Sequence, residues 1–183
     1  MKTLRLTMFA FISFLIAAQV HGQEAPEEHA AYAHLKVLEP LVGSWTMTGT
    51  SDQGVDFEYK LTFSWTRNKS MLLGDATVRV LGDGPDQPEV PWHHVGYVWN
   101  DNTDSIEMTR LHLNSGVVDV ASLTAMGGGK FRRSQIRSTT KDQVTEDTVT
   151  TISGAKVFVA STNRKNAAGE ALPDNTATLV RSK

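Results

Sequence analysis

A chain of 183 residues is long enough to bury one substantial core, and the absence of cysteine excludes disulfides, thiolate metal sites and a cysteine nucleophile. The formal net charge of −2 comes without a basic stripe, which argues against nucleic acid and anionic membrane surfaces as partners. Composition and charge therefore favour one packed domain whose stability depends on its core alone.

The first 22 residues have the three-part pattern of a secretory signal peptide. Lys2 and Arg5 form a basic start, residues 8–20 are almost entirely apolar, and cleavage is expected after Gly22. The apolar run is shorter than the roughly 20 residues that a membrane-spanning helix needs, although an uncleaved N-terminal anchor is the alternative. Cleavage removes both basic residues and takes the net charge from −2 to −4. We expect an exported protein, periplasmic or secreted, with no membrane attachment after cleavage.

Residues 23–40 are predicted to form a polar lead-in and one short helix. Residues 27–38 are good helix formers with apolar side chains at helical spacing. Pro40 is expected to end the helix, because the residue before a proline is pushed out of the α region.

Residues 41–183 are predicted to be all β. Residues 55–65 alternate strictly between apolar and polar, so that one face of a strand is buried and the other is solvated. Tight polar turns separate the other predicted strands, which are residues 44–50, 71–81, 95–99, 106–113, 117–125, 131–139, 143–152, 156–163 and 176–181. Strands at this spacing indicate a sandwich or a barrel.

The start of the β region carries a family resemblance. The stretch from Leu38 to Trp45 reads Leu-Glu-Pro-Leu-Val-Gly-Ser-Trp, and a later hairpin contains Gly96-Tyr97 and Asn100-Asp101. A Gly-X-Trp after a short helix, followed by up-and-down strands, resembles the calycin superfamily, and within it small bacterial lipocalin-like proteins of unassigned function. The resemblance implies an antiparallel up-and-down lipocalin-like β-barrel with one short N-terminal helix. Tryptophan there would plug the closed end of the barrel.

The nitrobindins, a related barrel family, start similarly and carry haem on a histidine near the end of the chain. This chain has no histidine after His112. We therefore expect no haem, and no other cofactor is indicated.

The apolar face of residues 55–65 is the first candidate binding surface. A barrel of about eight strands either fills with side chains or holds one small ligand. On packing grounds alone we expect a filled core, because protein interiors usually close-pack, and a cavity for a small hydrophobic molecule is the alternative. The candidate ligand-binding residues are Trp45, Phe57, Tyr59, Phe63, Trp65, Arg110 and His112.

Arg110 and His112 share one face of a predicted strand, and Leu111 and Leu113 share the other. An inward Arg110 and His112 would mark a site for an anionic or polar ligand head, since such groups are costly to bury without a partner. The leucines are the better core residues, which favours a solvated Arg110.

Two further pairs of neighbouring residues are interpreted as structural and not as functional sites. His93 and His94 lie near a loop end, and as strand neighbours they would face opposite ways and could not bind one metal ion together. Arg132 and Arg133 also face opposite ways, and we interpret them as part of a solvated surface.

Three functions of different classes fit the sequence. A non-catalytic barrel that binds a small, largely apolar ligand predicts an internal cavity open at one end. A packed structural or protein-interaction module predicts a filled interior and an exposed apolar patch. An enzyme that uses Arg110 and His112 predicts both side chains in a cavity beside a third polar group. The first is the hypothesis that we favour.

Overall fold

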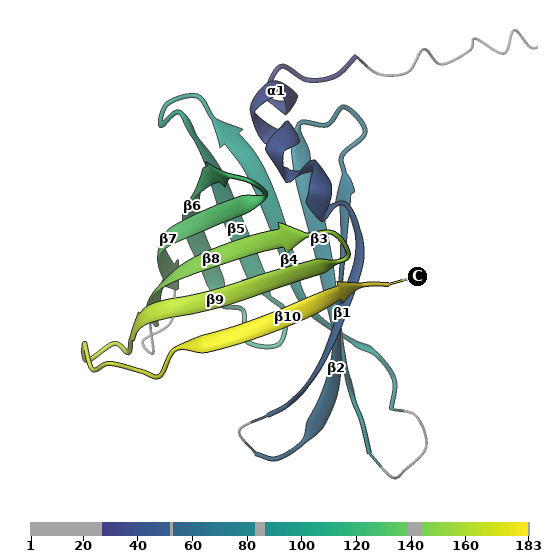
Figure 1. The fold of residues 1–183 in the computed structure, drawn as a ribbon, viewed down its shortest axis with the longest axis vertical. Coiled ribbons are helices and arrows are strands. Elements are labelled where there is room, and N and C mark those ends of the chain that lie inside the picture. Colours follow the sequence, from purple (N-terminus) through teal and green to yellow (C-terminus); the bar gives the residue numbers. More distant parts are fainter. Residues whose placement is uncertain (1–26, 52, 83–86, 139–143, 183) are drawn as a thin grey trace, which may run out of the picture.

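The protein is a closed barrel of ten antiparallel strands, seen here in a computed structural model that describes residues 27–51, 53–82, 87–138 and 144–182 (Figure 1). Each strand pairs with the strand that follows it in the chain, and the first strand pairs with the last to close the wall. The predicted all-β, up-and-down barrel with one short helix is therefore confirmed. The predicted signal peptide lies outside the described residues.

The barrel wall contains every strand that the sequence predicts. The strands are β1 (Gly43–Thr50), β2 (Asp56–Trp65), β3 (Met71–Val80), β4 (Val90–Asn100), β5 (Ser105–His112), β6 (Val118–Gly127), β7 (Lys130–Ser138), β8 (Thr145–Ser153), β9 (Lys156–Lys165) and β10 (Asn175–Arg181).

The helix at the end of the barrel is shorter than predicted and differs in type. It consists of α1 (Tyr32–Leu35) and the 3₁₀ helix η1 (Lys36–Leu41), and Pro40 lies inside η1 rather than beyond it. Short 3₁₀ runs are common at the ends of α-helices, and here such a run carries the chain past Pro40 to the start of β1. No helix in the described part of the chain is long and apolar enough to cross a membrane.

Strand β4 begins five residues earlier than predicted, at Val90. Thr77 of β3 pairs with Pro91, and the preceding Ala76 pairs with His93, so Trp92 is an extra residue at a bulge. A bulge accommodates proline, which cannot donate a ladder hydrogen bond. His93 therefore lies in a strand and not at a loop end.

Trp45 closes the end of the barrel that η1 leads into. Its ring is 1% exposed, and its indole N–H donates to the Leu41 carbonyl at 2.6 Å. The Arg181 guanidinium lies 4.3 Å from the ring and donates to the carbonyls of Val42 and Pro40. These contacts join the helix, β1 and β10 into one closed end.

The interior is not filled, so the expected packed core is wrong for much of the barrel. A cavity of about 830 Å³ extends from the Trp45 end towards the loops after β1 and β3. Barrel diameter grows with strand number, and ten strands enclose more space than the side chains of this chain occupy.

Candidate functional site

The cavity wall is mostly apolar, and β2 supplies one continuous side of it. Phe57, Tyr59, Leu61 and Phe63 all line the cavity, as the alternation of the sequence predicts, and Trp45 lies at the closed end. The strand therefore positions these side chains through its two-residue period.

Trp65 continues the same pattern but does not line the cavity. Its indole N–H donates to Glu39 at 2.8 Å, and its ring packs edge-on against Tyr32 of α1. The end of β2 reaches beyond the closed end of the barrel, so the inner side of this strand faces the helix there. The structure separates Trp65 from the other candidate ligand-binding residues for this reason.

Arg110 and His112 line the cavity, whereas Leu111 and Leu113 are 39% and 37% exposed. The predicted orientation of this strand, with the leucines inside, is therefore wrong. The reason lies on β6, where Asp119 stands directly opposite Arg110 in the register and is only 5% exposed. A buried carboxylate compensates the cation, which removes most of the cost that disfavoured the inward orientation.

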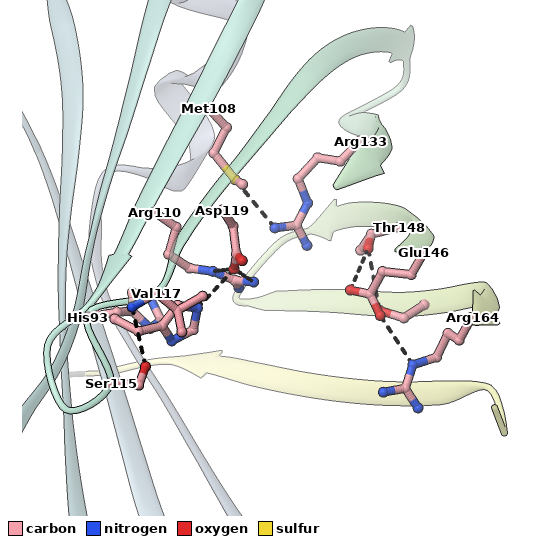
Figure 2. Close-up of polar contacts among 12 residues, drawn as sticks. His93, Met108, Arg110, Ser115, Val117, Asp119, Arg133, Glu146, Thr148 and Arg164 are labelled. Atoms are coloured by element: carbon pink, nitrogen blue, oxygen red, sulfur yellow. Dashed lines mark hydrogen bonds and ion pairs between the residues drawn. The ribbon is translucent and has the colours of Figure 1, made fainter. Parts of the chain in front are cut away.

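Asp119 holds the side chains of Arg110 and His112 in place, and Figure 2 shows its contact with Arg110. Its Oδ2 accepts from Arg110 Nε at 2.9 Å and Nη2 at 2.5 Å, and it lies 2.8 Å from His112 Nε2. Burial by itself raises the pKa of this carboxyl, but the hydrogen bonds from His112 and Arg110 outweigh it and hold the pKa below the usual value. Asp119 is therefore ionised at neutral pH, with its Oδ2 bound to both Arg110 and His112.

His93 and Tyr59 form a second polar pair on the cavity wall. The Tyr59 hydroxyl lies 3.2 Å from His93 Nε2, and His93 is 6% exposed. Burial, assisted by the charge of Arg110, lowers the pKa of His93 to about 3, so the imidazole is neutral at pH 7. Burial also raises the pKa of Tyr59, which keeps the phenol protonated. Among the described residues, His93 Nδ1 has no hydrogen-bond partner.

His94, the neighbour of His93, points outward and lies 2.6 Å from Asp75. The two histidines thus face opposite sides of the wall, as strand geometry predicts. Within the described segments, no three histidine, aspartate or glutamate side chains are arranged to hold a metal ion.

Arg133 lines the cavity from β7 and is not the solvated residue that the sequence suggested. Its Nη1 contacts the Met108 thioether sulfur at 3.5 Å, and its buried Nε has no partner in the described part of the chain. Burial lowers the pKa of the guanidinium, although arginine stays protonated in proteins. Its neighbour Arg132 faces outward and pairs with Asp147 at 3.3 Å.

Three residues of this polar cluster were not among the sequence candidates: His93, Asp119 and Arg133. Asp119 could have been found, because a short turn between residues 112 and 118 sets it opposite Arg110 once the hairpin register is assumed. The inward position of His93 follows a bulge, and that of Arg133 follows the register of β7, neither of which a single sequence shows.

Comparison with known proteins informs the fold and nothing further. No family model matches the sequence, and no curated protein matches it. Among solved structures, Rv2717c from M. tuberculosis is similar with a TM-score of 0.53 and 18% identity, over 86% of this chain and 100% of that one. At this identity the likeness shows a shared β-barrel architecture.

Proposed function

We propose that this chain is an exported, non-catalytic barrel of lipocalin-like type that binds a small, largely apolar molecule in its cavity. The observation that carries the proposal is the cavity itself, whose volume of about 830 Å³ falls within the range of roughly 300–1,000 Å³ that suits small-molecule sites. Its lining also fits, because apolar and aromatic side chains dominate it and a smaller number of polar groups lie among them.

The closed end supports the lipocalin-like assignment. Gly43 has a φ of 117°, a conformation that favours glycine, and a Cβ there would lie 2.6 Å from Arg181 Nη1. The Gly-X-Trp stretch is therefore fixed against β10, which gives the resemblance a physical basis in this chain.

The two competing hypotheses explain less of the molecule. A packed interaction module has no use for a cavity of this size. An enzyme would use His112 beside Arg110 and Asp119, and that polar cluster exists. Among the described residues, however, no serine or threonine hydroxyl is hydrogen-bonded to His93 or His112, and the one hydroxyl beside a histidine there is the phenol of Tyr59, whose raised pKa keeps it protonated. Binding is the function that uses the whole cavity.

A neutral fluorescent probe tests this function. We expect N-phenyl-1-naphthylamine to bind the purified protein saturably at one site, with the rise in fluorescence that an apolar environment causes. Ala177 lines the cavity, so Ala177→Trp should fill part of it and weaken binding by at least about tenfold, since lost burial of a ring costs more than 1.4 kcal/mol.

Thr178→Trp is the matched control, because Thr178 is the next residue on β10 and is exposed. It should leave the dissociation constant unchanged. Absence of saturable binding to the wild-type protein, or equal binding by both variants, would contradict the proposal and favour the packed-module hypothesis.

A further inference from the structure

Among the described residues, the inner wall and the adjoining ends of β8 and β9 carry one guanidinium group that no carboxylate pairs with. Asp119 pairs with Arg110, and Glu146 of β8 pairs with Arg164 of β9 at 3.1 Å. Each carboxylate thus already has a guanidinium partner. Arg133 is the third guanidinium, and in the described part of the chain it makes no ion pair.

Arg133 is therefore a cation inside the barrel that has no ion-pair partner among the described residues, although burial lowers its pKa and the charge of Glu146 acts against that lowering. Within the described part of the chain the one polar contact of Arg133 is the Met108 thioether, which is a weak acceptor. A buried charge without a partner is costly, and a protein that keeps one in a cavity gains only when a ligand supplies the opposite charge. In the view of Figure 2, the Arg133 guanidinium lies between the Arg110–Asp119 pair and the side chains of Thr148 and Glu146.

Glu146 is a neighbouring carboxylate whose charge acts on Arg133, but Arg164 pairs with it, and the other described groups on this part of the wall do not oppose an anion. His93 is neutral, Tyr59 carries a protonated hydroxyl, and Asp119 is engaged by both Arg110 and His112. The wall around Arg133 therefore offers hydrogen-bond donors and net positive charge.

The rest of the cavity suits an apolar chain. On β7, Phe131 lies two residues from Arg133 on the same inward face and nearer the closed end, and it is 3% exposed. The lining continues towards that end through apolar side chains, which include Trp45, Phe63, Leu123 and Leu179. An elongated ligand can place its charged end at Arg133 and its body against these residues.

We propose that the ligand is an anionic amphiphile, an apolar chain with a carboxylate head, and that Arg133 binds the head. This inference rests on the proposed function and adds the chemical class of the ligand. Because the salt link forms in a largely apolar cavity, it should contribute substantially to affinity, as charge-assisted hydrogen bonds do.

The test compares two ligands of equal chain length in displacing the neutral probe. We expect hexadecanoate to bind the wild-type protein at least about tenfold more tightly than hexadecan-1-ol, below the concentration at which either self-associates. Arg133→Gln should bring the two dissociation constants to within about twofold of each other, mainly by weakening hexadecanoate. Arg132→Gln, the matched control at an outward position, should keep the wild-type preference.

The outcomes separate the two proposals. Equal affinity of the wild-type protein for both ligands would overturn this inference and leave the apolar binding function standing. A carboxylate preference that survives Arg133→Gln would overturn the role of Arg133. If neither ligand displaces the probe, the inference is overturned while the probe titration still judges the binding function. The comparison on the wild-type protein decides the ligand class even if Arg133→Gln fails to fold.

Discussion

At the scale of single residues, His93 shows how burial sets the chemistry of the site. The residue is 6% exposed, its one hydrogen-bond partner in the described part of the chain is the Tyr59 hydroxyl, and three neighbours that can carry positive charge oppose its protonation: Arg110, His112 and His94. The imidazole is therefore a neutral polar group on a wall that also carries two arginines. It can donate or accept a hydrogen bond but does not add positive charge.

The stability of the barrel should fall in mild acid because of this histidine. The pKa of His93 is about 3 in the folded protein against 6.5 in an unfolded chain, so below pH 6.5 the unfolded state binds a proton that the folded state does not. Its stabilising contribution is complete above pH 6.5 and is lost as the pH falls from 6.5 towards 3. Asp119, whose pKa is below 3.8, acts in the same direction only at lower pH.

Urea unfolding at pH 7 and pH 5 measures this effect. We expect the wild-type protein to lose about 1–2 kcal/mol more of its free energy of unfolding between these pH values than His93→Gln, which cannot titrate there. Equal losses in the two proteins would mean that His93 is not buried as a neutral ring.

At the scale of elements, the closed end depends on contacts between segments that are far apart in the chain. Arg181 of β10 donates to carbonyls at the end of η1 and lies over Trp45 of β1. On the other side of the helix, His34 stacks on Trp99 of β4 with 3.8 Å between ring centroids. A helix this short has little stability of its own, so these tertiary contacts fix it.

Trp45→Ala tests the closed end. Because the ring is 1% exposed and packs beneath Arg181, its loss should lower the free energy of unfolding by about 3–5 kcal/mol. Chemical denaturation followed by circular dichroism measures the change, and Trp92→Ala is a suitable comparison, since Trp92 is 40% exposed and should cost much less. An unchanged unfolding midpoint for Trp45→Ala would be inconsistent with a buried plug.

The strands were predictable as elements because each shows alternation or a β-rich run between turn residues. The boundaries of β2 and β5 differ from the prediction by a single residue at one or both ends. Strand β4 was predicted too short, since Pro91 argues against a strand unless a bulge accommodates it. Alternation reveals which residues share a face, but it does not reveal which face is inside when both carry plausible core residues.

At the scale of the whole molecule, the export signal is the prediction that lies outside the described residues. We propose that residues 1–22 direct the chain out of the cytoplasm and are then removed. Intact mass measurement of the exported protein should give a chain that begins at Gln23, and Leu15→Arg, which interrupts the apolar run, should retain the full-length protein in the cytoplasm. An exported protein that still carries residues 1–22 would instead support the N-terminal anchor.

An all-β chain and the apolar face of β2 were predictable from the sequence, because both follow from local periodicity and turn chemistry. The choice of an up-and-down barrel over a sandwich came from the family resemblance. The contents of the barrel, in contrast, are visible only in the assembled structure. Whether ten strands leave a cavity depends on the closed circumference, and whether Arg110 and His112 face inward depends on Asp119 across the hairpin. The unpaired charge of Arg133 among the described residues is likewise a property of its surroundings, since only the assembled wall shows that Asp119 and Glu146 are each already paired with another arginine.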